Sequence, residues 1–563
     1  MKIHPTKILV FIVLLLFAEC RTKKNKVAHA SLSSIDLKRG EIVSCGPQDG
    51  EMFGTVSFSA SIPDSLQKDF NIAIALLHSF EYDEAEKMFA KVIDQSPDCA
   101  MAYWGVAMCN FHALWAPPSQ SELLKGAKAI EIARSIEKKT KRESDYIEAI
   151  AIFYENAQQS SHHSRVLKFE NAMEKIYKTY PDDKEAAIFY TLALDAAADP
   201  ADKTYANQKK AFSILNPIFQ EEPLHPGIAH YIIHNCDYPE LAALALPAAK
   251  KYASIAPASA HAQHMPSHIF TRLGLWDECI QSNLVSISSA QCYAQKAKIK
   301  GHWDEELHGL DYLVYAYLQK GEDEAAKKQL EYLQTINEVY PVDFKTAYAF
   351  AAIPARYFLE QKMWKEAANL QIHPANFPWE KFPWQRAIID FARLLGSVHT
   401  NNITEAESEL ENLKSLYTIL SKQKDKMQEA AQVAVQIKTS EAWIEYGKGN
   451  TGKALEFMKA AADMEDGMEK HPVTPGEVIP ARELFAEMLL QMNKPELALE
   501  NFETDLKRHP NRFNGLYGSG IAALHSNNKT KAKEYFKKLL DDADSHCKRK
   551  ELAEAKAFLK TSN

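Results

Sequence analysis

The stretch that decides the fold is residues 71–108, NIAIALLHSFEYDEAEKMFAKVIDQSPDCAMAYWGVAM. Its apolar residues recur every three or four positions, which is the spacing of one face of a helix. A small residue, Ala85, is followed by Phe89, Val92 and Pro97, and a second helix-periodic segment begins soon after the proline. The pattern therefore predicts two helices joined by a short turn, with a small side chain where the helices pack closely.

The same spacing returns along the chain with a period of 34 residues. Ala498 is followed by Ala532, and Ala211 by Ala245, each 34 positions later. A period of this length, with the small, aromatic and proline positions in register, resembles the tetratricopeptide repeat. The resemblance implies an all-α fold, a tetratricopeptide-type helical-hairpin solenoid wound as a right-handed superhelix over residues 66–563. We expect about nine or ten helix pairs and no division into independent domains.

The N-terminus has the features of a secretion signal. Lys2 and Lys7 precede an apolar run at 8–18, which suits a signal peptide and is short for a transmembrane helix. Cys20 follows the run closely, as in bacterial lipoprotein signals. We therefore expect residues 1–20 to be a signal peptide and Cys20 to be lipidated. The alternative is a plain secretory signal with a nearby cleavage site.

The region between the signal and the repeats is polar and does not follow the repeat pattern. Residues 21–65 are expected to form a tether and an N-terminal cap. Within them TVSFSAS, at 55–61, alternates in polarity and predicts a short extended segment.

The composition is that of a soluble folded protein and limits the classes of function. The formal net charge of −8 gives no basic surface for nucleic acid. The sequence has no P-loop and no dinucleotide-binding fingerprint, so we expect no nucleotide cofactor. Eight cysteines occur without a CxxC pair, and we expect no disulfide framework in a chain of this size.

Histidines concentrate in one window of the chain. Two pairs, His230/His234 and His264/His268, are four residues apart, which on a helix places both imidazoles on one face, as a pair of metal ligands requires. The histidines of this window are His225, His230, His234, His261, His264 and His268.

The repeat register places these pairs on the first helix of their hairpins, which lines the concave groove of such arrays. Neighbouring first helices lie roughly 10 Å apart, so imidazoles from two repeats can meet at one ion. The sequence therefore predicts a transition-metal site, in a groove centred on residues 225–315, made by His230, His234, His264 and His268.

Other residues of the same groove are expected to add ligands or to support the site. A set rich in histidine suits Zn, Cu, Fe or Ni, and the shortage of carboxylates argues against Ca or Mg. Arg356 could hold an anionic ligand instead, or be solvated. These additional candidates are His261, His308, Asp311, Tyr315 and Arg356.

Two local features bear on the groove. Pro266 lies inside a predicted helix, so that helix either starts there or kinks there, and both options re-aim His264 relative to His268. The loop HPVTPGEVIP, at 471–480, is too long for a simple turn between helices and is expected to fold over the groove.

Several strings, among them HMPSHIFTRLGLW and HPVTPGEVIPARELF, resemble a bacterial group of large exported tetratricopeptide proteins. The resemblance supports the helical-repeat fold and implies no established activity, and the sequence selects no catalytic residue. We expect an exported scaffold of the cell envelope, in the periplasm or on the outer surface. It would hold a transition metal, as a binding protein or a metalloenzyme, and would meet a membrane only through a lipid anchor. The alternative is a metal-free module whose groove binds a peptide or a protein.

Overall fold

The structure is a computed structural model that describes residues 35–46, 52–114 and 117–561. These residues form two compact units. The first unit contains the described residues up to Val43 together with Phe53–Tyr231, and the second contains the described residues of Ser44–Met52 together with Ile232–Asn563. The boundary falls inside a helix, Pro226–Asn235, and not at a linker.

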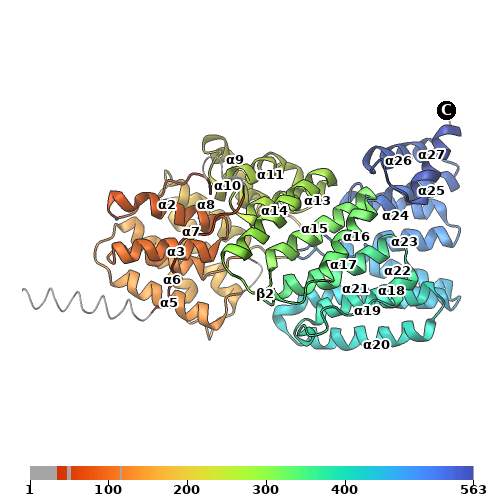
Figure 1. Cartoon of the computed structure of the whole chain (residues 1–563), viewed down its shortest axis with the longest axis horizontal. Coiled ribbons are helices and arrows are strands. Elements are labelled where there is room, and N and C mark those ends of the chain that lie inside the picture. The colour runs from red at the N-terminus through yellow and green to blue at the C-terminus, as the bar shows by residue number, and fades with distance from the viewer. Residues whose placement is uncertain (1–34, 47–51, 115–116, 562–563) are drawn as a thin grey trace, which may run out of the picture. The chain divides into compact units, whose positions relative to one another are not determined.

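Both units are built from helices that follow one another along the chain (Figure 1). Helices of the first unit are α2 (Asp64–His78), α3 (Tyr82–Gln95), α4 (Ala100–Cys109), α5 (Gln120–Ser135), α6 (Lys141–Tyr154), α7 (His162–Thr179), α8 (Lys184–Ala196) and α9 (Ala206–Glu221), with α10 (Pro226–Asn235) at the boundary. The second unit begins with α11 (Ala242–Ile255), α12 (Ala260–His264), α13 (Pro266–Leu273), α14 (Trp276–Lys296), α15 (Asp304–Lys320), α16 (Asp323–Leu333), α17 (Phe344–Glu360) and α18 (Trp364–Ala368). It continues with α19 (Pro383–His399), α20 (Ile403–Leu420), α21 (Met427–Gly447), α22 (Thr451–Asp466), α23 (Ala481–Gln491), α24 (Pro495–Arg508), α25 (Phe513–His525), α26 (Lys529–Asp542) and α27 (Lys550–Thr561), with short 3₁₀ helices at Trp379–Lys381 and Lys424–Lys426. The all-α fold of helical hairpins is confirmed.

The repeat is held together by aromatic rings that pack on glycines of the following helix. Ala85 and Phe89 of α3 are fully buried. A Cβ added at Gly105 of α4 would lie 2.3 Å from the Phe89 ring, and one added at Gly518 would lie 2.3 Å from the Phe502 ring. Each glycine lies 16 residues after its aromatic partner, so the same contact recurs in both units. A hydrogen at this position lets consecutive helices approach closely and bury their apolar faces.

Within the second unit the first helices of successive hairpins pack side by side. Helix α15 contacts α17, α17 contacts α19, and α19 contacts α21, while α14, α16, α20 and α22 pack on them from the other side. This is the arrangement that stacked tetratricopeptide-type hairpins produce. The residues on the first helices of this unit are therefore neighbours in space.

Helix ends follow signals in the sequence. Ser119 and Glu122 form a reciprocal capping box at the start of α5. Helices α13 and α15 end at Gly274 and Gly321, which take the left-handed conformation with φ of 64° and 69°. Glycine reaches this conformation without the penalty of a Cβ.

Extended structure is scarce in the described residues. The segment at 55–61 forms no helix and buries Phe58, in agreement with the predicted extended segment. The structure also has a pair of two-residue parallel strands, β1 (His302–Trp303) and β2 (Val339–Tyr340), which the sequence did not predict. A two-residue strand is too short to show the alternation that marks a strand in a sequence.

A disulfide joins Cys45 to Cys292 of α14, both in the second unit, across 247 residues. The backbone N–H of Cys45 also donates to the carbonyl of Ala258, at 3.3 Å. No pattern in the sequence predicted this pairing, because the register that brings the two cysteines together arises only when the hairpins stack. The other described cysteines form no disulfide.

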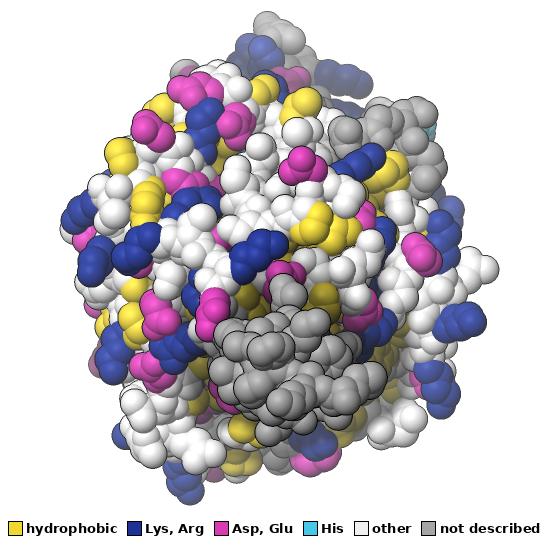
Figure 2. All heavy atoms as spheres, turned by 90° about the vertical axis from the view of Figure 1, so that its left-hand side faces the viewer, with side chains coloured by type: hydrophobic (Ala, Val, Ile, Leu, Met, Phe, Trp, Pro, Cys, Tyr) yellow, Lys and Arg dark blue, Asp and Glu magenta, His cyan; other side chains and the backbone are white. Residues whose placement is uncertain are grey.

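The exposed face of the first unit mixes charges of both signs. Figure 2 shows Lys and Arg side chains interspersed with Asp and Glu over the described surface of this end of the chain. Among the described helices, none is long and apolar enough to cross a membrane. The predicted lipidation site, Cys20, and the predicted signal peptide lie outside the described residues.

Candidate metal centre

Three buried histidines converge in the second unit. His264 comes from α12, His268 from α13 and His308 from α15, and their side chains present ring nitrogens that all lie within 4.8 Å of one another. The ring centroids of His264 and His308 are 4.2 Å apart. The three residues are 0%, 3% and 6% exposed. Three potential ligand atoms are therefore gathered around one point away from solvent.

The break at Pro266 shapes this cluster. Helix α12 ends at His264, and α13 begins with Pro266 as its first residue, where a missing N–H is harmless. Met265, between them, keeps right-handed helical angles, φ −51° and ψ −36°. Of the two alternatives that the sequence left open, a new helix or a kink at Pro266, the structure shows a new helix. His264 and His268 thus point toward each other from the two sides of an interrupted helix.

Asn283 fixes the tautomer of His264. The Asn283 amide nitrogen donates to the carbonyl of Cys279, at 2.8 Å, so its oxygen is the atom that faces His264. That oxygen lies 2.7 Å from His264 Nδ1. The network therefore assigns the proton to Nδ1, and Nε2 carries the lone pair.

Asp237 fixes the tautomer of His268 in the same way. Its Oδ2 lies 3.0 Å from His268 Nδ1, which donates to it. The same carboxylate accepts from Arg272 Nε at 2.9 Å and from Lys470 Nζ at 2.8 Å. Burial alone would raise the pKa of Asp237, but the Lys470 ammonium and the Arg272 guanidinium hold that pKa below its usual range. Asp237 is therefore a carboxylate, and His268 Nε2 carries the lone pair.

The two Nε2 atoms face each other at 3.2 Å. In the tautomers assigned above, both present lone pairs, and two lone pairs at this separation repel unless a proton or a metal cation lies between them. Ligand atoms of a tetrahedral ion with bonds of about 2.0–2.1 Å lie about 3.3 Å apart. The separation of the two nitrogens is thus close to that of two ligands of one metal ion.

Burial keeps the three rings neutral. It lowers the pKa of His264 and of His308 well below the usual value. The nearby His268 lowers the pKa of His264 further, and His264 does the same for His308. Burial also lowers the pKa of His268, although Asp237 opposes the change. Neutral imidazole is the form that binds metals, and a shared proton is disfavoured here.

Tyr312 closes one side of the cluster. Its hydroxyl lies 3.3 Å from Nδ1 and 3.4 Å from Nε2 of His268, and its ring stands edge-on to His264 at 4.6 Å. Burial raises its pKa well above the usual range, so the hydroxyl stays protonated and can donate.

The remaining histidines of the predicted site lie beside this cluster or apart from it. In the second unit the His234 ring is 6.4 Å from those of His261 and His268. His261 Nδ1 lies 3.5 Å from a Glu305 carboxylate oxygen. His230 belongs to the first unit, where its Nδ1 lies 2.6 Å from the backbone carbonyl oxygen of His78. The structure thus groups His264 and His268 with His308, which the sequence ranked as an additional candidate.

Asp311, Tyr315 and Arg356 form a different, ion-paired network. Arg356 is fully buried, pairs with Asp311 and donates to the carbonyl of Gly476 at 2.8 Å. Arg512 Nη1 lies 3.1 Å from the Tyr315 hydroxyl. Burial raises the pKa of Asp311 to about 6, although Arg356 lowers it. The Arg356 guanidinium is thus paired with groups of the chain itself.

The loop at 471–480 folds over the first helices of the second unit, as the sequence predicted. Besides Arg356, the Tyr348 hydroxyl of α17 donates to the Gly476 carbonyl, at 3.3 Å. Lys470, just before the loop, reaches Asp237. At these residues the predicted groove is filled by the chain itself.

The sequence did not predict the residues that orient the three histidines. Asp237, Asn283, Tyr312 and Lys470 are common residue types at no special spacing, and 233 positions separate Asp237 from Lys470. Only the fold brings them together, so no periodic signal could have found them.

A second buried group lies in the first unit and differs in its hydrogen bonding. The two oxygens of Glu185 each lie 2.9 Å from an Nε2, one of His78 and one of His225. His78 Nδ1 lies 2.9 Å from the Tyr231 hydroxyl. Here each Nε2 has a carboxylate to donate to, so no lone pairs are opposed, and hydrogen bonds explain the arrangement without an ion.

Comparison with known proteins supports the repeat. The family model of the tetratricopeptide repeat matches residues 70–113 and 484–546, so repeats of this type occur in both units. No curated protein matches the chain.

Solved structures with similar helical arrangements are distant from this chain. A human IFIT1 dimer with PPP-AAAA is 12% identical, with 86% of this chain and 96% of that chain covered and a TM-score of 0.35. The P58(IPK) TPR domain is 12% identical, with 89% and 99% covered and a TM-score of 0.21. Naa15/Naa10 bound to HypK-THB is 12% identical, with 89% and 74% covered and a TM-score of 0.22.

Proposed function

We propose that this chain is a tetratricopeptide-type scaffold that holds one transition-metal ion in its second unit. The ligands are Nε2 of His264, Nε2 of His268 and a ring nitrogen of His308. The observation that carries the proposal is the pair of Nε2 atoms 3.2 Å apart, both with lone pairs directed into the cluster. A cation between them turns a repulsive contact into two bonds.

The surroundings of the histidines support a metal ion over a simple hydrogen bond. Asn283 and Asp237 accept from the Nδ1 atoms, which is the usual arrangement behind histidine ligands and makes the opposite nitrogen a better donor to the metal. Three imidazoles suit Zn, Cu, Fe or Ni. They leave one position of a tetrahedral ion for water or a substrate, as metal sites that act as Lewis acids require.

The second candidate function is a metal-free module that binds a peptide or protein. The observation that favours it is the match of tetratricopeptide repeats at 70–113 and 484–546, neither of which contains the three histidines. The two functions are compatible, because none of the proposed ligands belongs to the matched repeats.

We also propose that the chain is exported and anchored through Cys20. The proposal rests on the signal-like N-terminus and is supported by the Cys45–Cys292 disulfide, since disulfides persist in oxidising compartments. A Cys20→Ala variant tests the anchor: it should leave the membrane fraction and lose incorporated labelled fatty acid. An unchanged membrane fraction without any label would contradict lipidation.

Cobalt substitution tests the metal site. Metal-free protein titrated with Co²⁺ should develop the intense visible absorption of a four-coordinate ion, saturating at about one equivalent. His308→Ala should weaken binding or change the spectrum, while His546→Ala, at an exposed position, should do neither. A weak spectrum typical of hydrated Co²⁺ in the unaltered protein would count against the site.

A further inference from the structure

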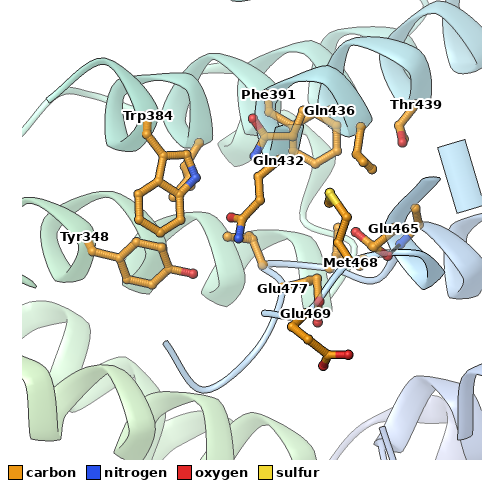
Figure 3. Close-up of a pocket in the computed structure, with 15 residues that line it drawn as sticks. Tyr348, Trp384, Phe391, Gln432, Gln436, Thr439, Glu465, Met468, Glu469 and Glu477 are labelled. Atoms are coloured by element: carbon orange, nitrogen blue, oxygen red, sulfur yellow. Dashed lines mark hydrogen bonds between the residues drawn. The ribbon is translucent and has the colours of Figure 1, made fainter. Parts of the chain in front are cut away.

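A small cavity of the second unit has two chemically different walls. It lies between α17, α19 and α21 and the segment that leads from α22 to α23. Figure 3 shows Tyr348 and Trp384 on one side and Glu465, Glu469 and Glu477 on the other, with Gln432 and Gln436 between them. An apolar aromatic surface thus faces a group of carboxylates across the same space.

The cavity is lined by carboxyl groups and by no basic side chain of the described residues. Three of its lining side chains are carboxylates, and none of the described residues that line it is Lys, Arg or His. Glu477 is paired outside the cavity with His509, at 2.9 Å. Glu465 accepts from the backbone N–H of Ala481, at 2.5 Å. Burial, with Glu477 nearby, raises the pKa of Glu465 well above its usual value, so a bound cation would favour its charged form.

The amide groups add an unsatisfied acceptor. Gln436 Oε1 is shielded from solvent and has no hydrogen-bond partner in the described structure. A buried acceptor of this kind is destabilising until a donor reaches it. A bound group that carries a donor would satisfy this acceptor.

Size and aromatic character select among cations. The cavity volume is about 40 Å³, which is room for roughly three water-sized groups. That space admits an ammonium group with the first two methylenes of its stem and excludes a sugar ring. The faces of Trp384 and Tyr348 attract organic cations, and they offer nothing to a hard metal ion, which prefers oxygen ligands all round.

We infer that this cavity binds an organic cation, an ammonium group on an alkyl stem. The carboxylates and Gln436 accept from its N–H groups, and Trp384 and Tyr348 cover the stem. The group could belong to a free amine or to a lysine side chain of a bound peptide. These residues are separate from the histidine cluster, so binding of the cation does not depend on the metal.

Calorimetric titration of the full-length protein tests this assignment. The probes are butylammonium chloride, the peptide acetyl-Gly-Lys-Gly-amide, butanol as a neutral match and CaCl₂. We expect butylammonium or the peptide to bind and butanol and Ca²⁺ not to bind. Tighter binding of the peptide would identify a protein side chain as the occupant, and binding of the free amine alone would identify a small molecule.

Variants locate the binding. Glu465→Gln keeps an acceptor for the Ala481 N–H and removes the charge, so it should weaken butylammonium binding at least tenfold. Trp384→Leu should weaken it independently, and Glu411→Gln, an exposed carboxylate of α20, should leave it unchanged. Equal binding of butanol, binding of Ca²⁺ in place of the amine, no amine binding at millimolar concentration, or full binding by both cavity variants would overturn the inference.

Discussion

Asn283 determines which nitrogen of His264 is available to a metal. Its amide is held by the Cys279 carbonyl, so its oxygen must face His264 Nδ1. In Asn283→Leu this acceptor is lost and the ring is free to take the other tautomer. We predict that zinc affinity falls about 10–100-fold, as for other partners of histidine ligands. Competition with a chelating dye measures the change.

The control for this prediction is Asn412→Leu, an exposed asparagine of α20. It should keep the affinity of the unaltered protein. If Asn283→Leu also kept that affinity while remaining folded, the assigned tautomer of His264 would be wrong.

Asp237 holds two buried cations as well as His268. Removing its charge in Asp237→Asn leaves Arg272 and Lys470 without their counter-ion at 8% and 5% exposure. Breaking a buried ion pair from one side costs about 3–5 kcal/mol, so the free energy of unfolding should fall by that order. Urea denaturation measures the loss.

A second substitution separates the charge effect from other damage. In Asp237→Asn/Lys470→Met one uncompensated cation is removed, and part of the lost stability should return. Strictly additive effects of the two substitutions would show that the Asp237–Lys470 contact is not formed.

At the scale of single residues, the sequence singled out the candidate ligands but not which of them lie together. The spacing of His264 and His268 was visible because a helix turns its side chains every 3.6 residues. The pairing of His308 with them depends on how α15 packs on α12, and the roles of Asp237 and Asn283 depend on contacts between distant segments. No local pattern encodes such contacts.

The contact between aromatic ring and glycine sets how closely consecutive helices pack. In Gly105→Ala the new Cβ would lie 2.3 Å from Phe89, whose ring is fully buried and has no room to move. Overpacking of this kind costs about 1–3 kcal/mol, and we predict a loss of that size in the free energy of unfolding. Chemical denaturation of the purified variant measures it.

Gly452→Ala is the matched control, because a Cβ there meets nothing within 4 Å. In helix α22 alanine is the better helix former, so this variant should be as stable as the unaltered protein or more so. A loss in Gly105→Ala no larger than that in Gly452→Ala would contradict the role of the contact with Phe89.

At the scale of elements, the sequence predicted most of what the structure shows. The 34-residue period located the helices around Ala85, Ala498 and Ala532, since small residues must recur where helices cross. At Pro266 the chemistry of proline predicted either a new helix or a kink, and the structure shows a new helix. The paired strands β1 and β2 were not predicted, because a strand of two residues is too short to show an alternating pattern.

Among the described residues, one disulfide links distant parts of the second unit covalently. We predict that Cys45→Ser lowers the free energy of unfolding by about 2–4 kcal/mol, because the bond restricts the unfolded chain. Reductant should destabilise the unaltered protein by the same amount and leave Cys45→Ser unaffected. Thermal melts with and without reductant measure both effects.

Cys547→Ser, which removes a free thiol, serves as the control and should keep the response to reductant. If reductant had no effect on the unaltered protein, the disulfide would not form in solution, and the support it gives to export would be lost.

At the scale of the whole molecule, the sequence predicted a helical-repeat chain but not its division. The boundary between the two units lies within α10, where neither composition nor a proline-rich linker marks it. Such a boundary depends on which helices pack against each other. The sequence does not show it, because the repeat pattern is the same on both sides of the boundary. The predicted groove histidines are consequently shared between the units, with His230 in the first and the others in the second.

Elemental analysis of the purified full-length protein tests whether the histidine cluster holds a metal ion. We expect about one equivalent of Zn, Cu, Fe or Ni per chain, retained by His546→Ala and lost from His264→Ala/His268→Ala. Circular dichroism of the double variant would confirm that it still folds. No metal in the unaltered protein, even after supplementation at neutral pH, or equal metal in the double variant, would contradict the site.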